Sequence, residues 1–205
     1  KVYKDNSLIA ANITGTSYGL TGLSANTAYS MQVSAVNSIE ESAKSTSLSV
    51  ITAQAVSGPT VSTLAGSGTQ GFADGSATAA KFGWPYGVAV DGSGNVYIAD
   101  KDTNRIRKIT PFGTVSTIAG STFGFSDGSA TVAKFDYPYG VAVDGSSNVY
   151  VADYTNNRIR KVATSGVVST LAGSGTRGFS DGNGTLAQFS LPTGLAVDGS
   201  GNVYV

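Results

Sequence analysis

A segment of about 53 residues repeats along most of this 205-residue chain. The string VSTLAG begins at residue 61, VSTIAG at 115 and VSTLAG again at 168, so the spacing is 54 and then 53 residues. A second string, YGVAVDGSGNVYIAD from residue 86, returns in similar form from residues 139 and 193. A fixed period of this length is typical of architectures in which each unit buries its apolar faces against its neighbours.

Inside one period, the residue pattern predicts short strands separated by turns, at residues 87–90, 95–99, 105–110 and 114–119. The stretch from Asp91 to Asn95 is rich in residues that tolerate a positive φ, as a tight hairpin requires. The first strand is apolar on both faces, so both faces must be covered. Four-stranded sheets stacked radially as the blades of a β-propeller meet that demand, and a solenoid is the alternative. An Ala-rich stretch, residues 77–82, is the one candidate for a helical turn.

The repeated unit resembles a known family. The strings PYGVAVD, GNVYIAD and NRIR, from Pro85 to Arg107, are similar to the NHL repeat, and nearly the same strings recur from Pro138 to Arg160. The preceding VSTLAGSGTQGFADGSATAAKF resembles the long-loop variant of bacterial members. The resemblance implies an all-β fold in which residues 61–205 form about 2.7 four-stranded blades, fewer than the 4 to 8 of a typical closed ring.

Residues 1–53 form a different unit. Its string NTAYSMQVSAVN from Asn26 resembles the second half of a fibronectin type III domain, and Leu23, Thr27 and Tyr29 have the spacing of that family's tyrosine corner. The resemblance implies a partial β-sandwich, joined to the blades by a linker at 54–60. We expect the chain to be a segment of a longer protein, with self-association as the alternative if its open sheets are not completed.

Composition restricts the chemistry. Basic and acidic residues number 13 each, which gives no electrostatic footprint for nucleic acid. No run approaches the ~20 apolar residues of a membrane-spanning helix, so we expect no membrane insertion in this segment. The absence of Cys and His excludes thiolate and imidazole chemistry, and we assign no catalytic residue, metal or cofactor. Animal NHL propellers bind RNA on a basic face, but neutrality instead favours a solvated, salt-bridged strand for Arg105, Arg107 and Lys108 and their copies Arg158, Arg160 and Lys161.

Most acidic residues of the blades recur with the repeat, which favours structural roles for them. Asp91, Ser93 and Asn95 have the oxygen spacing of a calcium loop, but the later bidentate carboxylate is missing, so we predict a hairpin turn. A second group follows the second strand, and we predict that it braces strand to loop, with ligand contact as the alternative. This group comprises Asp100, Asn104 and Arg105 in one repeat and Asp153, Asn157 and Arg158 in the next.

Recognition of an asymmetric ligand requires positions that differ between blades. The variation concentrates just before the first strand, where Gly83-Trp84-Pro85-Tyr86 becomes Asp136-Tyr137-Pro138-Tyr139. In a propeller this loop opens onto the central channel. We predict that an aromatic collar there binds a carbohydrate or protein ligand, with capping of the blade core as the alternative. The predicted ligand-binding residues are Trp84, Tyr86, Asp136, Tyr137 and Tyr139.

These expectations favour a secreted or cell-surface binding or adhesion module. One alternative is a propeller enzyme, because some propellers that the blades resemble are lyases or lactonases, whose active-site residues would then lie mostly in other blades. Another alternative is a purely structural array.

Overall fold

The computed structural model describes residues 1–15, 17–52 and 61–205, so the predicted linker at 54–60 lies outside the described residues. The chain divides into two compact units, Lys1–Val61 and Ser62–Val205. Within the described ranges, no helix is long and apolar enough to cross a membrane.

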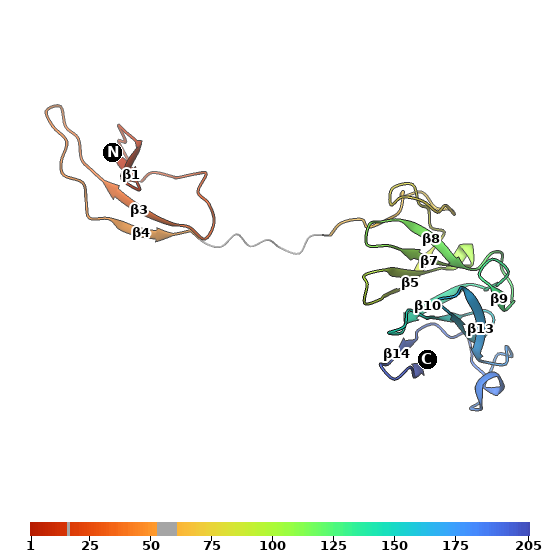
Figure 1. Ribbon diagram of the computed structural model, residues 1–205. Coiled ribbons are helices and arrows are strands. Elements are labelled where there is room, and N and C mark those ends of the chain that lie inside the picture. Colours follow the sequence, from red (N-terminus) through yellow and green to blue (C-terminus); the bar gives the residue numbers. More distant parts are fainter. Residues whose placement is uncertain (16, 53–60) are drawn as a thin grey trace. The chain divides into compact units, whose positions relative to one another are not determined.

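The N-terminal unit contains an antiparallel sheet with strand order β2-β1-β3-β4 (Figure 1). Asp5 and Asn6 both have positive φ, which is the backbone conformation of a two-residue hairpin with the twist that strands prefer. Tyr29 is buried, and its hydroxyl accepts a hydrogen bond of 2.9 Å from the backbone N–H of Ser24. The strands are β1 (Val2–Lys4), β2 (Ser7–Ala10), β3 (Ala28–Val33) and β4 (Leu48–Ile51).

The second unit contains two complete antiparallel blades and the first two strands of a third. The first blade comprises β5 (Pro85–Val90), β6 (Val96–Asp100), β7 (Arg105–Ile109) and β8 (Val115–Ala119). The second comprises β10 (Pro138–Val143), β11 (Val149–Asp153), β12 (Arg158–Val162) and β13 (Val167–Ala172). The third begins with β14 (Ala196–Val197) and β15 (Val203–Tyr204).

The predicted helical turn at 77–82 is a hydrogen-bonded turn, in which Ala80 N–H donates to the carbonyl of Ser76. Among residues 61–205, 3-10 turns form at η1 (Lys101–Thr103), between β6 and β7, and at η2 (Gly184–Leu186), in the third repeat. The described residues are thus almost entirely strands, turns and loops, which confirms the all-β propeller prediction.

The two complete blades pack face to face. Tyr97, Ala99 and Ile106 of the first blade share one buried core with Val141 and Val151 of the second. The innermost strands β5 and β10 lie side by side (Figure 1). A Cβ on Gly87 would stand 2.3 Å from the carbonyl oxygen of Tyr139, so glycine is required where these strands approach. This packing accounts for the apolar residues at the contact, where Val141 is buried and Ala89 packs against the shared core.

A long loop precedes each complete blade and folds back on the outermost strand of that blade. In the first blade, Gly75 and Val115 exchange two backbone hydrogen bonds of 3.0 and 2.8 Å. In the second blade, the same region forms β9 (Gly128–Ser129), which pairs with β13. This pairing covers the edge of the outer strand and brings the aspartate before each of these glycines over the sheet.

Candidate functional site

The variable loop ahead of each inner strand is fastened to the end of the second strand. In the first blade, the N–H groups of Gly83 and Trp84 donate to Oδ1 of Asp100 at 2.8 and 3.0 Å. The N–H of Lys101 donates to the carbonyl of Trp84 at 3.0 Å. The loop and the β6–η1 connection therefore lie together at one edge of the blade.

Aromatic side chains gather at this edge from both complete blades. The rings of Tyr86 and Tyr139 lie 4.3 Å apart between centroids, and Tyr139 stacks on Tyr154 at the same separation. Trp84, Tyr86 and Tyr137 are 55%, 59% and 43% exposed, so their rings are available to a ligand. We refer to these five residues, Trp84, Tyr86, Tyr137, Tyr139 and Tyr154, as the aromatic patch.

Sequence reasoning missed two members of this edge, Tyr154 and Lys101. They occupy equivalent positions, directly after the repeated Asp153 and Asp100, and this position changes from Lys to Tyr between blades. The available signal was that this position begins a three-residue stretch, 101–103 and 154–156, that differs between two otherwise similar strings.

Asp136 is the acidic residue in the loop of the second blade. Its N–H donates to Oδ1 of Asp153 at 2.8 Å, and its carbonyl accepts from the N–H of Thr155 at 3.1 Å. Burial raises the pKa of the Asp136 carboxyl. The Asp136 carboxyl is thus partly desolvated.

A buried ion pair fixes the strands beneath the loop. Asp100 and Arg107 are fully buried, and Nη1 of Arg107 lies 3.2 Å from Oδ2 of Asp100. Arg107 also pairs with Asp74 of the long loop at 2.6 Å and donates to the carbonyls of Ala73 and Lys81. The arginine therefore joins the second strand, the third strand and the long loop.

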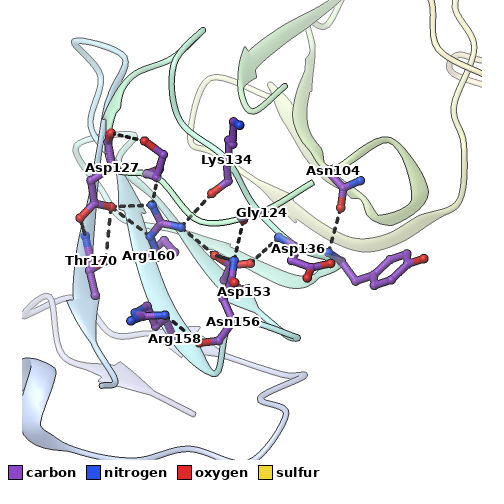
Figure 2. A network of polar contacts seen from close by, with 12 residues as sticks. Asn104, Gly124, Asp127, Lys134, Asp136, Asp153, Asn156, Arg158, Arg160 and Thr170 are labelled. Atoms are coloured by element: carbon purple, nitrogen blue, oxygen red, sulfur yellow. Dashed lines mark hydrogen bonds and ion pairs between the residues drawn. The ribbon is translucent and has the colours of Figure 1, made fainter. Parts of the chain in front are cut away.

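The second blade repeats this network around Arg160 (Figure 2). Arg160 pairs with Asp153 at 2.7 Å and with Asp127 at 2.5 Å. Burial raises the pKa of Asp153 to about 6, against the opposing effects of the Asp136 N–H, Asn156 and Arg160. The repetition indicates a structural role.

Arg105 and Arg158 have different surroundings from those predicted. Arg105 donates to the carbonyl of Thr103 at 2.7 Å, and its guanidinium lies 4.0 Å from the ring centroid of Phe72. Arg158 lies over the ring of Phe125 at 3.9 Å. The structure thus pairs the aspartates with Arg107 and Arg160, which are buried and not on a solvated strand.

Asn104 and Asn157 connect consecutive blades. Oδ1 of Asn104 accepts a hydrogen bond of 2.9 Å from the N–H of Tyr137 (Figure 2), and Oδ1 of Asn157 accepts one of 2.9 Å from Leu191. All four of these residues have a positive φ between 51° and 56°. The asparagine amide oxygen of one blade therefore holds the variable loop of the next.

Asp91 closes the hairpin between β5 and β6. Oδ1 accepts from the N–H groups of Ser93 and Asn95, and Oδ2 accepts from the side chains of Asn95 and Tyr97. Burial alone would raise the Asp91 pKa, but these hydrogen bonds outweigh it and lower the pKa to about 2. In the described part of the chain, no group of three or more His, Cys, Asp or Glu is placed to hold a metal.

Comparison with known proteins agrees with this geometry. The NHL repeat family matches residues 82–109 and 135–162. The chain carries NHL repeats. Both matches run from the aromatic loop to the end of the third strand, so they include the buried ion pair and the asparagine that joins the blades.

Relatives share the repeats over part of their length. The chain is 35% identical over 121 residues to Protein SUPPRESSOR OF QUENCHING 1, chloroplastic, of Arabidopsis thaliana, which covers 53% of this chain and 11% of that protein. It is 39% identical over 89 residues to human Teneurin-4, covering 36% of this chain and 3% of Teneurin-4. The chain therefore spans a small fraction of these relatives.

Solved structures show the same fold. A protein of unknown function from Bacteroides thetaiotaomicron superposes with a TM-score of 0.54 at 31% identity, over 58% of this chain and 31% of that one. An auxiliary nutrient binding protein from the same organism gives 0.51 at 24% identity, over 58% and 33% of the two chains. The second likeness concerns the fold alone.

Proposed function

We propose that the NHL-repeat unit is a recognition module that binds a carbohydrate or protein ligand on the aromatic patch. One observation carries this proposal: three large aromatic side chains are exposed together at the edge where the sequence varies from blade to blade. Flat, exposed rings provide contact area at a low cost in side-chain entropy. The recurring polar residues, in contrast, are engaged in hairpins and buried ion pairs.

We also propose which type of domain precedes this module, which type of NHL repeat it contains and where the protein is located. The hydrogen bond between the Tyr29 hydroxyl and the backbone of Ser24 supports the second half of a fibronectin type III sandwich in the N-terminal unit. The long loop that folds over each outer strand supports the bacterial long-loop type of repeat. Such a pairing of units favours a secreted or cell-surface location, which a fractionation experiment on the producing cell would test.

A glycan array and a peptide array test the binding function. We expect the 205-residue chain to bind a defined subset of ligands, and we expect the double variant Trp84→Ala, Tyr137→Ala to lose that subset. The matched control is Phe112→Ala with Phe179→Ala, because these rings are 96% and 91% exposed and lie outside the patch. An unchanged profile in the patch variant would exclude the patch as the binding site. Turnover of a lactone would favour an enzyme instead.

A further inference from the structure

The ammonium group of Lys101 lies among three rings of the aromatic patch. Nζ is 4.7 Å from the ring centroid of Tyr137, 5.7 Å from that of Tyr139 and 5.9 Å from that of Trp84. These distances fall within the range in which the negative face of an aromatic ring attracts a cation. The rings come from two blades, so the chain assembles a three-sided aromatic site around one of its own ammonium groups.

Lys101 is not part of the buried scaffold. Its side chain is 23% exposed, and its ammonium is paired at 3.3 Å with the adjacent Asp102, in a surface ion pair of small energetic weight. The equivalent position in the second blade is Tyr154, so the fold does not require lysine here. The side chain can therefore move out of the rings without disturbing the core.

The charges of this edge favour a cationic ligand over an anionic one. Asp102 pairs with Lys101 at 3.3 Å, which places one carboxylate beside the ammonium that lies among the rings. The neighbouring Arg105 is held on Phe72 and on the carbonyl of Thr103. When the Lys101 side chain moves out, the three rings and the Asp102 carboxylate form a site suited to an ammonium group.

We propose that the aromatic patch binds the ammonium group of a lysine or methylated lysine side chain in a protein ligand, and that Lys101 occupies this site in the free protein. This inference rests on the proposed binding function and specifies the class of ligand. The incoming ammonium displaces that of Lys101, so Lys101 acts as an internal competitor.

Trp84 is the single tryptophan of the chain, so its fluorescence reports on the site directly. The probes are three peptides that are identical except at one position, which carries trimethyllysine, lysine or uncharged norleucine. We expect saturable changes in Trp84 emission with the first two, and at least about tenfold weaker binding of the norleucine peptide. Tyr137→Ala should weaken the binding of both cationic peptides.

Substitution of the internal competitor provides a sharper test. Lys101→Met keeps an unbranched side chain that is one heavy atom shorter and removes its charge. We expect it to tighten binding of the trimethyllysine peptide by about two- to fivefold. Lys108→Met is the matched control, because the Lys108 ammonium lies 5.7 Å from the ring of Tyr97, outside the patch. Binding by this control should equal that of the unaltered chain.

Several results would overturn the inference. Equal binding of the norleucine peptide would mean that the rings recognise an apolar group, and weaker binding by Lys101→Met would mean that Lys101 contacts the ligand. No response to any of the three peptides would also reject it. If a neutral oligosaccharide then binds and loses affinity in Tyr137→Ala, the proposed binding function stands with a different ligand. If neither the peptides nor the oligosaccharide binds, the proposed binding function is rejected as well.

Discussion

Arg107 and Arg105 stand two residues apart on β7, but their surroundings differ. Arg107 is fully buried between Asp100 and the long loop, whereas Arg105 lies on the ring of Phe72 and retains some exposure. Removing one partner of a buried ion pair leaves a charge without compensation, so Arg107→Leu should lower the free energy of unfolding by about 3–5 kcal/mol. Arg105→Leu, the matched control, should cost about 1 kcal/mol. Urea denaturation followed by circular dichroism measures both, and equal losses would contradict this assignment.

The hairpin aspartate predicts a pH dependence. The pKa of Asp91 is about 2 in the folded chain and near 3.8 in the unfolded chain, so the unfolded state binds more protons between these values. Its contribution is therefore fully present above pH 4 and is lost as the pH falls toward 2. Asp91→Asn should be about 1 kcal/mol less stable at pH 6, and the difference should shrink on acidification. Thermal melts across this range measure it, with Asp181→Asn, an exposed loop carboxylate, as control.

The sequence predicts which polar residues have a structural role, but it does not predict which residues they contact. The repetition of Asp100 and Asp153 predicts a structural role, but it does not say which arginine each one meets. Arg105 and Arg107 lie on the same face of the strand as Asp100, so strand alternation does not separate them. The choice depends on the carbonyls of the long loop, which lies 26 to 34 residues away from Arg107 in sequence. Only the folded arrangement provides that information.

At the scale of the elements, the predicted strands correspond to β5 to β8 with shifts at their ends. The first strand begins at Pro85 and not at residue 87, because Pro85 pairs with Asp100 beyond a register shift. Such an irregularity leaves no periodic signal in the sequence. The existence and order of the strands follow from the turn residues, whereas the packing of the aromatic loop against η1 requires the structure.

The contact between blades gives a prediction at this scale. Asn104→Gly preserves the positive φ of this position but removes the amide oxygen that accepts from Tyr137, so exchange of the Tyr137 amide hydrogen should accelerate. Asn104→Asp retains an acceptor oxygen and should keep the protection. We expect a loss of about 1 kcal/mol in stability for the glycine variant alone. Hydrogen exchange measured by NMR reports each amide separately.

The equivalent hydrogen bond between the second and third blades, from the Leu191 N–H to Oδ1 of Asn157, provides an internal control in the same sample. The Leu191 amide should exchange at the same rate in all of these variants. Acceleration at both amides would indicate general loosening of the blades and would contradict a local role for Asn104.

At the scale of the whole molecule, equivalent residues of the two complete blades differ in exposure. Val88 on β5 is 63% exposed, whereas its counterpart Val141 on β10 is 6% exposed and lies in the core shared with the first blade. The sequence predicts that both faces of a blade must be covered, and the structure identifies the first blade as the cover for Val141. The equivalent face of the first blade, which carries Val88, is exposed.

This open face predicts self-association of the 205-residue chain through blade-to-blade packing. Burying a valine side chain contributes about 1.5–3 kcal/mol, and Val90 is also 59% exposed on the same strand. Val88→Asp should therefore shift the chain toward the monomer without unfolding it, while Val141→Asp should unfold the second blade. Val167→Asp is the control, because Val167 is 50% exposed on the outer strand β13. Sedimentation velocity over a range of concentrations measures the association, and identical behaviour of Val88→Asp and Val167→Asp would contradict packing through this face.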